Sequence, residues 1–129
     1  MQPAPIKKLI TFDDFEKLDI RIGTIISVLD VAKSNKLMKL IVDFGDHTRS
    51  ILSGIKQERG NPQELEGKQA LFVVNIAERK MAGELSQGML FDIGYADKQG
   101  MLFDIGYADK QCPCLAMPEV PVANGSRAG

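Results

Sequence analysis

Apolar and β-branched residues gather in short runs along the middle of the chain, separated by turn-forming glycine, asparagine, aspartate and proline. Runs of this length, several of which alternate polar and apolar positions, favour strands over helices. The first run holds one internal glycine, Gly23, where we expect the strand to bend, and the Gly-Asp pair at 45–46 predicts a hairpin. The pattern predicts strands over residues 21–29, 36–44, 49–53, 69–75 and 88–95, and 114–117 is a candidate for a further short one.

Capping residues indicate two short helices. Thr11 stands three positions before Asp14, the spacing of an N-cap and an acidic third residue, and predicts a helical turn at about residues 12–17. Proline near the start and glycine at the end of residues 61–67 predict a second helix of one or two turns. Residues 1–10 contain two prolines and are expected to form a loose arm.

The order of these elements predicts the fold class. Three strands, a short helix and two more strands, with little other helix, are typical of a small closed or partly closed barrel. We therefore expect an all-β protein, a five-stranded OB-type barrel with short helices. A length of 129 residues suits a single domain over residues 11–129, preceded by the arm at 1–10.

A segment of twelve residues occurs twice in tandem without a change: 88–99 read GMLFDIGYADKQ, and 100–111 read the same. Repeat architectures use longer, diverged units in several copies, so this is a duplication and not a solenoid. Each copy is long enough for one strand and its turn, so two identical strands compete for one place in the sheet. We expect the first copy in the barrel and 100–111 as an insert that loops out, adds a hairpin strand or exchanges between chains.

Composition and charge narrow the class of protein. Hydrophobic residues make up 44% and charged residues 26% of the chain, as in soluble globular proteins, and no apolar run is long enough to span a bilayer. The first lysines follow the prolines with no long apolar stretch behind them, so we expect a cytoplasmic protein with no secretory signal and no membrane partner. Sixteen Lys and Arg against seventeen Asp and Glu give a net charge of −1, so a nucleic-acid surface would have to be a local basic patch.

Few residues could carry catalysis or hold a metal. Cys112 and Cys114 flank one proline, a spacing too close for an ordinary disulfide, and two cysteines are too few to complete a four-ligand zinc site. We therefore interpret them as unpaired thiols, with a redox or metal role as the less favoured alternative. His47 is the single histidine and lies in a turn sequence, which favours a solvated residue over a catalyst. The chain has no glycine-rich phosphate loop and no acid, base and nucleophile set. We therefore expect no enzyme, no metal and no cofactor.

Residues 75–89 have the composition of a binding surface. They leave a buried strand at Asn75, cross an Arg-Lys-Met-Ala-Gly loop at 79–83 and re-enter with Ser86 and Met89. The basic pair can meet phosphates, and methionine offers a soft apolar contact to a base. Small barrels bind single strands or loops on one face with such groups. In the structural alternative the glycines merely shape a hairpin and Met89 belongs to the core.

Eight stretches carry a resemblance to a known family, and they span the chain from about residue 14 to residue 129. The stretches are Asp14–Gly23, Asn35–Leu37, Ile51–Ile55, Glu64–Lys68, Val74–Ile76, Arg79–Gly83, Ser86–Leu90 and Pro121–Gly129. In this order they resemble the tRNA-binding OB domain that occurs free-standing in bacteria, at the C-terminus of many methionyl-tRNA synthetases and in synthetase cofactors of the EMAP II type.

The resemblance implies a non-catalytic module, commonly a homodimer, that recognises the shape of folded tRNA, with an aminoacyl-tRNA synthetase as a further candidate partner. In such a site basic side chains meet phosphates, amide and hydroxyl groups bond to sugar or backbone, and methionines lie against bases. Asn75 and Ser53 could equally be turn and barrel-closing residues. The binding positions that the resemblance carries over are Asn35, Lys36, Ser53, Asn75, Arg79, Lys80, Met81, Ser86 and Met89.

The sequence departs from the family's usual pattern in two places. Residues 33–37 read KSNKL where the family has Asn-Ala-Asp-Lys-Leu, and the duplication directly follows the Ser-x-Gly-Met motif. Two other functions stay open. One is a chaperone of the related CsaA type, which binds polypeptides in an apolar cleft. The other is an adaptor that docks on a synthetase and does not bind RNA on its own. Salt separates RNA from peptide binding, because phosphate contacts weaken steeply as salt rises and apolar burial does not.

Overall fold

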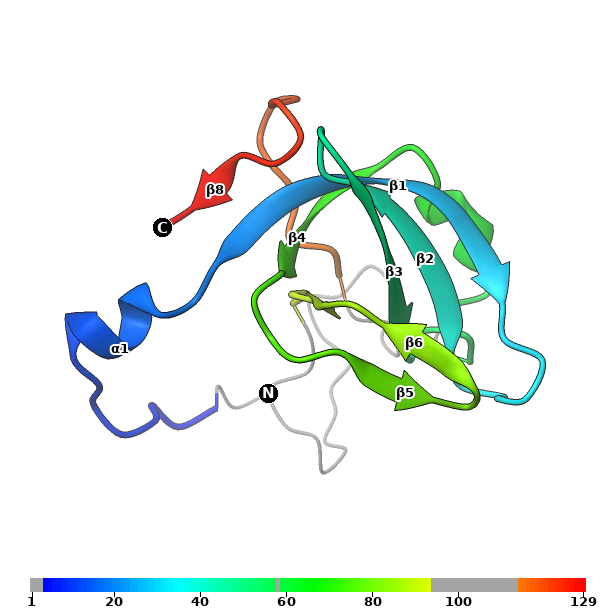
Figure 1. Cartoon of the computed structure of the whole chain (residues 1–129), viewed down its shortest axis with the longest axis horizontal. Helices are drawn as coiled ribbons and strands as arrows, with labels where there is room; N and C mark the ends of the chain where they lie inside the picture. The colour runs from blue at the N-terminus through cyan, green and yellow to red at the C-terminus, as the bar shows by residue number, and fades with distance from the viewer. Residues whose placement is uncertain (1–3, 58, 94–113) are drawn as a thin grey trace.

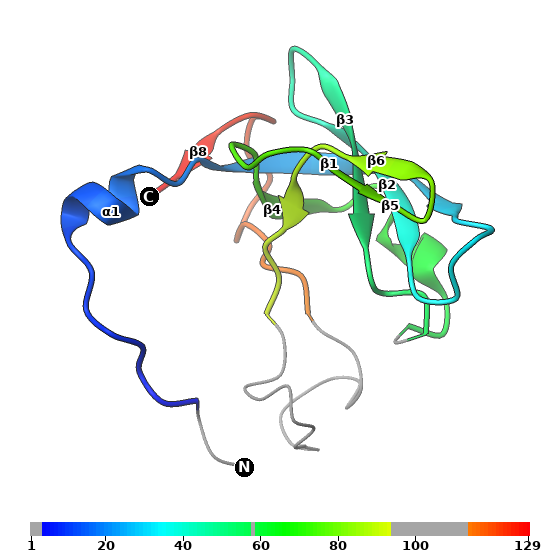
Figure 2. The same cartoon turned by 60° about the horizontal axis from the view of Figure 1, so that its bottom comes forward.

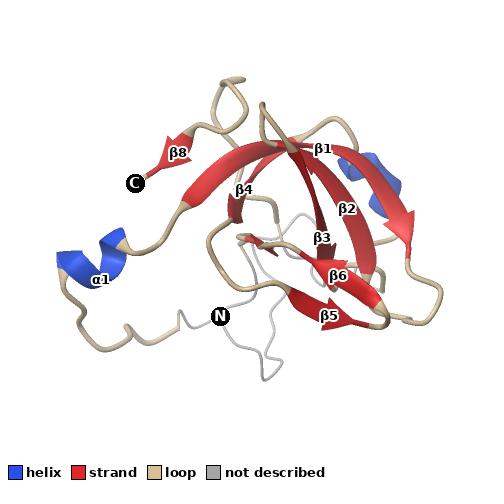
Figure 3. Ribbon diagram, in the orientation of Figure 1, coloured by secondary structure: helices blue, strands red, loops and turns tan. Residues whose placement is uncertain are grey.

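A computed structural model describes residues 4–57, 59–93 and 114–129, and one strongly curved sheet makes up most of it (Figures 1 and 3). The strands are β1 (Ile20–Asp30), β2 (Met38–Asp43), β3 (Thr48–Ser53), β4 (Gln69–Val73), β5 (Arg79–Met81), β6 (Glu84–Ser86), β7 (Met89–Leu90) and β8 (Arg127–Ala128). The order across the main sheet is β3-β2-β1-β4-β7, and β8 pairs with β1 beside that path. A separate two-stranded sheet consists of β5 and β6.

Both predicted helices are present and short. α1 (Phe12–Glu16) begins after Thr11, whose side-chain oxygen accepts a hydrogen bond of 3.1 Å from the Asp14 amide, as the capping pattern predicts. η1 (Pro62–Leu65) is a 3-10 helix that places Leu65 in the core. α1 buries none of its residues and extends away from the barrel (Figures 1 and 2). Among the described helices, none is long and apolar enough to cross a membrane.

β1 is the central strand, since it pairs with β2, β4 and β8. Its register with β2 shifts between Ile25 and Ser27, two residues beyond Gly23, where a bend is expected from the sequence. A bulge of this kind increases local twist and helps a long strand follow a curved sheet. Gly23 is also required for close packing, because a β-carbon at this position would lie 2.5 Å from Val42 Cγ1.

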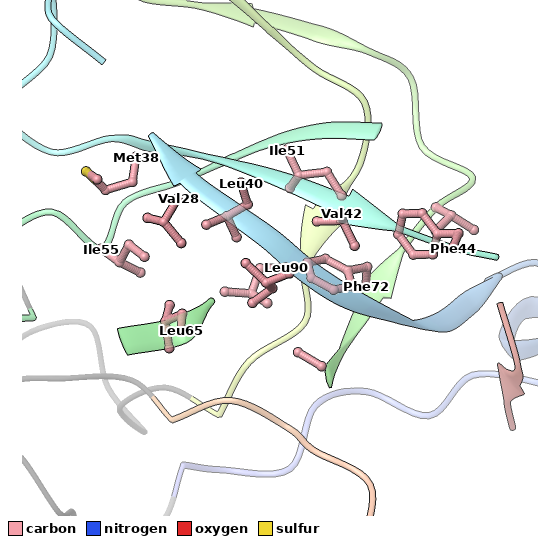
Figure 4. Packing of buried hydrophobic residues seen from close by; sticks show 13 residues of the cluster. Val28, Met38, Leu40, Val42, Phe44, Ile51, Ile55, Leu65, Phe72 and Leu90 are labelled. Carbon is pink, nitrogen blue, oxygen red and sulfur yellow. The ribbon is translucent and has the colours of Figure 1, made fainter. Parts of the chain in front are cut away.

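The core lies inside the curve of the sheet (Figure 4). Leu40 from β2, Ile51 from β3 and Phe72 from β4 are completely buried. Phe44, at the end of β2, meets Phe72 edge to face with ring centroids 5.6 Å apart. Leu90 of β7 joins the same cluster, so strands from both halves of the sheet curl around one core.

β3 and the segment at 86–88 close the open side of the barrel. The Gln87 amide donates to the Ser50 carbonyl at 2.8 Å, and the Leu52 amide donates to Ser86 Oγ at 3.0 Å. β3 and residues 86–88 are thus joined by both backbone and side-chain hydrogen bonds and not by a regular β-ladder. The described residues confirm the all-β, OB-type architecture that the order of elements predicts.

Three segments differ from the sequence-based expectation. The predicted 79–83 loop is largely strand, because it forms β5 and the turn of the β5–β6 hairpin. Of the strand predicted over 88–95, residues 88–93 are described, and they contain β7 followed by an isolated bridge from Ile93 to Cys114. β8 lies in the C-terminal tail, where no strand is predicted.

The duplicated segment lies only partly within the described residues. Met89 and Leu90, from the first copy, pair with Val73 and Phe72 of β4, as expected if this copy supplies the barrel strand. Residues 94–113 fall outside the described part of the chain, and with them the second copy at 100–111 and Cys112.

Candidate nucleic-acid interface

The basic pair of the 75–89 segment lies on a hairpin. Arg79 and Lys80 belong to β5, where both are exposed, and β5 pairs antiparallel with β6. Ala82 and Gly83 connect the two strands with φ angles of 50° and 82°. A two-residue hairpin turn of type I′ requires positive φ at both positions. The chain therefore presents these two cations from a strand and not from an irregular loop.

The hairpin tip lies against the loop between β1 and β2, as Figures 1 and 2 show. A β-carbon on Gly83 would be 3.8 Å from the side chain of Lys33 in that loop. Lys39 of β2 forms an ion pair with Glu84 of β6 at 3.0 Å and holds the hairpin beside the sheet. Lys33, Lys39 and Glu84 are absent from the predicted site. Of these three residues, only Lys33 could have been suspected from the sequence, because it is the first residue of the KSNKL segment that differs from the family pattern.

Asn35 and Lys36 are exposed in the same loop, at 31–37. Ser34 Oγ accepts hydrogen bonds from the amides of Lys36, at 3.1 Å, and Leu37, at 3.0 Å. Side-chain bonds of serine to nearby amides stabilise turns in this way. The loop therefore has a defined shape, with Lys33 and Lys36 on either side of its serine.

Ser53 lies beside this loop. It ends β3 and pairs with Met38, the residue at which β2 resumes after the loop. Its side chain is half-buried, and its carbonyl accepts a hydrogen bond from the Ile55 amide at 2.9 Å. The structure thus brings the loop, Ser53 and the hairpin to one side of the barrel. We call the exposed polar and charged residues here the basic rim: Lys33, Asn35, Lys36, Arg79 and Lys80.

Asn75 and Ser86 are engaged within the protein. Asn75 Nδ2 donates to the Lys17 carbonyl at 2.6 Å, and its Oδ1 accepts from the Asp19 amide at 2.8 Å. Ser86 is 2% exposed, and its hydroxyl accepts from the Leu52 amide and donates to the Gly88 carbonyl, each at 3.0 Å. Asn75 therefore fastens the segment before β1 to the end of β4, and Ser86 closes the barrel under the hairpin.

The two methionines of the predicted site are not brought together. Met81 is half-buried on β5. Met89 is 47% exposed on β7, opposite Val73. Val73 also pairs with Ile20 at the start of β1, whereas the 31–37 loop follows the end of β1. Met89 therefore lies toward the opposite end of the barrel from the loop.

A small polar cavity of about 150 Å³ lies at that opposite end. Arg21 donates two hydrogen bonds of 3.0 Å to the Asp19 carboxylate and, with help from Arg127, lowers the pKa of Asp19 to about 2. Partial burial opposes this shift without reversing it. Asp19 is therefore a structural anion at neutral pH and has no proton to give.

His47 lies beside this cavity and is less free than a solvated turn residue. Its ring stacks on Phe44 with centroids 5.6 Å apart. Arg49 Nε donates to His47 Nε2, which leaves Nδ1 to bond to Asp46 at 2.6 Å. That bond lowers the pKa of Asp46. The nitrogens of His47 are thus occupied by neighbours on its own turn and strand.

The described residues contain no group of three His, Cys, Asp or Glu side chains placed to hold a metal ion. Cys114, the cysteine within the described range, is a free thiol. What the arrangement does provide is a cluster of exposed cations beside amide and hydroxyl groups, which suits a polyanion.

Comparisons with known proteins agree on one family. The family described as "Putative tRNA binding domain" matches residues 20–108. The chain is 46% identical over 91 residues to the methionine–tRNA ligase of Chlorobium chlorochromatii (strain CaD3), an alignment that covers 70% of this chain and 13% of the ligase. The chain thus spans only about one eighth of the length of that relative.

Solved structures with a similar fold cover almost the whole chain. A protein related to methionyl-tRNA synthetase from Pyrococcus horikoshii matches with a TM-score of 0.78 and 32% identity over 95% of this chain and 100% of that one. The chaperone CsaA from Bacillus anthracis str. Ames matches with a TM-score of 0.72 and 25% identity, again over 95% and 100%. The same barrel is therefore found in proteins described by two different functions.

Proposed function

The chain belongs to the tRNA-binding domain family, and on that premise we propose that it is a non-catalytic module that recognises the shape of folded tRNA. Only 13% of the ligase relative aligns with this chain, so the ligase reaction is not part of the proposal. A tRNA ligand implies a cytoplasmic protein, and the likeness to a ligase makes a synthetase a candidate partner.

The observation that carries this proposal is the basic rim. Its four cations come from two segments far apart in the sequence, the 31–37 loop and β5, which meet at the hairpin tip. The net charge of the chain is only −1, so this local cluster supplies the attraction to phosphates that the whole molecule lacks. Contacts of this kind follow the path of the RNA backbone and read shape more than sequence.

Different roles follow for the other predicted positions. Ser53 and Met81 border the basic rim and can add a hydroxyl bond and an apolar contact to a base or sugar. Asn75 and Ser86 act through the fold, since their hydrogen bonds hold the ends of β4 and β6. Met89 would touch RNA only if the bound surface extends to the opposite end of the barrel.

We also propose that two copies form a homodimer through the N-terminal arm. Leu9 is 95% and Phe12 84% exposed, and no residue of α1 is fully buried. An open groove of about 380 Å³ lies beside them, lined by apolar residues of α1 and by the C-terminal residues 127–129. Apolar patches rimmed by polar residues often mark surfaces that contact other proteins. A second copy packed about a two-fold axis would cover both arms at once.

The same groove gives some weight to a second function, a CsaA-type chaperone that binds apolar polypeptide segments. Salt distinguishes the two functions. Four phosphate contacts predict that tRNA affinity falls by roughly 50-fold to 150-fold between 50 and 200 mM salt. Binding of an unfolded polypeptide by apolar burial would hold or strengthen over that range. If the affinity for tRNA does not depend on salt and the protein prefers the unfolded polypeptide, the chaperone function would replace the tRNA proposal.

Co-purification tests the adaptor alternative. A protein that docks on a synthetase without meeting RNA would bring the synthetase with it from a lysate treated with ribonuclease. The purified chain would then show no tRNA binding of its own even at low salt.

A further inference from the structure

Lys56 is a basic residue near the basic rim whose ammonium is turned inward. It follows Ile55, which is 3% exposed in the core, and its own side chain is 22% exposed. Its Nζ lies 2.6 Å from Asp30 Oδ1, 3.0 Å from the Val31 carbonyl and 2.5 Å from the Ser34 carbonyl. An ammonium has three N–H donors, so these three acceptors use all of them.

The acceptors of Lys56 belong to one stretch of chain. Asp30 is the last residue of β1, Val31 is the first residue of the 31–37 loop, and Ser34 lies at its turn. The Lys56 amide also donates to the Lys36 carbonyl at 3.0 Å, so the loop is held at its start, at its turn and at its end. Since Ile55 fixes this lysine to the core, Lys56 ties the loop to the barrel, in addition to Val31, whose side chain is itself 2% exposed.

From these contacts we propose that Lys56 is a positioning residue of the RNA-binding surface. It holds the 31–37 loop in the shape in which Lys36 and Asn35 meet the RNA, and it makes no phosphate contact itself. The inference rests on the proposed function for the identity of the ligand.

The physical reason is the cost of ordering a loop when a ligand binds. Backbone freedom lost on binding subtracts from affinity, and a loop that is already ordered avoids that loss. In Lys56→Met the apolar stem stays against the core and the carbonyls of Val31 and Ser34 are left to water. The domain therefore folds, the loop loses its anchor, and tRNA affinity falls by about tenfold, the equivalent of one or two residues that must be ordered on binding.

A double-mutant cycle tests the inference with tRNA as the probe. Lys56→Met is measured alone, in a Lys33→Ala/Asn35→Ala/Lys36→Ala background that removes every basic-rim contact of the loop, and in an Arg79→Ala background. If Lys56 acts through the loop, its effect shrinks to less than about twofold when the loop contacts are gone and stays near tenfold without Arg79. A full effect in the loop background would overturn the inference, since Lys56 would then contact RNA directly. An effect that shrinks equally in both backgrounds would also overturn it, because Lys56 would then act on the hairpin as much as on the loop.

Two further measurements separate the possible causes. Lys68→Met removes the same charge from an exposed site beside Met117 and Pro118, and its tRNA affinity should stay within about twofold of the wild type. Amide hydrogen exchange without RNA should be faster over residues 31–37 in Lys56→Met and unchanged in Lys68→Met. Unchanged exchange in Lys56→Met overturns the anchoring claim whatever the tRNA result. If the wild type fails to bind tRNA, the proposed function is contradicted. The hydrogen-exchange measurement would still show whether Lys56 anchors the loop.

Discussion

Arg79 and Lys80 are adjacent cations on a short strand, and the proposed phosphate contacts depend on them most directly. Both are exposed, and the hydrogen bonds of the β5–β6 ladder hold the strand itself. Successive side chains of a strand point to opposite faces. Arg79 and Lys80 can therefore contact a curved RNA backbone that follows the hairpin edge from opposite faces of the strand.

Arg79→Ala/Lys80→Ala should weaken binding of all tRNAs alike, by roughly tenfold to a hundredfold at low salt, because it removes two phosphate contacts. The slope of log affinity against log salt should become shallower by about two. A filter-binding or polarisation titration at several salt concentrations measures both. The matched control is Lys17→Ala/Lys68→Ala, which removes two exposed lysines outside the basic rim. Equal losses in both variants would mean that charge in general, and not the hairpin, attracts the RNA.

Ser86 carries a prediction about stability and not about direct contact. Ser86→Ala leaves the buried Leu52 amide and Gly88 carbonyl without their hydroxyl partner, so the free energy of unfolding should fall by about 1–3 kcal/mol. Urea unfolding measures the loss. Ser50→Ala is the control, since the Ser50 hydroxyl is more exposed and makes a weak bond of 3.4 Å to the Leu85 carbonyl. An unchanged unfolding midpoint in Ser86→Ala would show that the hydroxyl does not close the barrel.

At this scale the sequence identifies the exposed cations and leaves open whether the polar groups contact RNA or serve the fold. Arg79 and Lys80 are recognisable because cations on a polar hairpin stay in solvent wherever the barrel places them. The partners of Asn75 lie more than fifty positions away along the chain, at Lys17 and Asp19. No local pattern can show that a polar side chain is satisfied by a segment so distant.

At the scale of elements, the predictable parts are those with a strong local pattern. The runs rich in β-branched residues form β1 to β4, and Thr11 caps the N-terminus of α1. β8 has two residues and exists because the tail returns to pair with Ile20 and Arg21. The β5–β6 hairpin depends on positive φ at Ala82, a position where the residue type gives no hint of a turn. β8, which exists through a long-range pairing, was therefore missed, and the hairpin was expected only as the structural alternative for residues 75–89.

The N-terminal arm makes a prediction about assembly. Leu9→Asp/Phe12→Asp places charges on two side chains that are 95% and 84% exposed, so each barrel should fold unchanged while the proposed dimer dissociates. Sedimentation velocity should show a dimer for the wild type and a monomer for this variant. Lys7→Asp/Lys8→Asp controls for added negative charge on the same arm. A wild type that sediments as a monomer, or a variant that remains dimeric, would contradict the assignment of the arm to the interface.

At the scale of the whole molecule, the chain is proposed to be one domain over residues 11–129 that carries an insert. The two copies of the duplicated segment are identical, so removal of 88–99 or of 100–111 yields the same shorter chain. That chain keeps the residues of β7 that pair with β4. It also keeps every residue of the basic rim.

Deletion of residues 100–111 should therefore give a folded protein with tRNA affinity within about threefold of the full chain, because a long insertion adds little loop-closure cost. Circular dichroism, thermal unfolding and tRNA titration check this expectation. Loss of the dimer or of solubility after the deletion would show instead that the insert is part of the assembly.

The central claim is that this barrel reads the shape of folded tRNA through the basic rim, and one affinity measurement tests it most directly. The purified full chain is titrated with bulk folded tRNA at low and moderate salt, with an unstructured RNA of equal length as competitor. The account predicts preferential binding of the folded tRNA that weakens steeply as salt rises. Equal affinity for the two RNAs, or no binding at low salt, would contradict it.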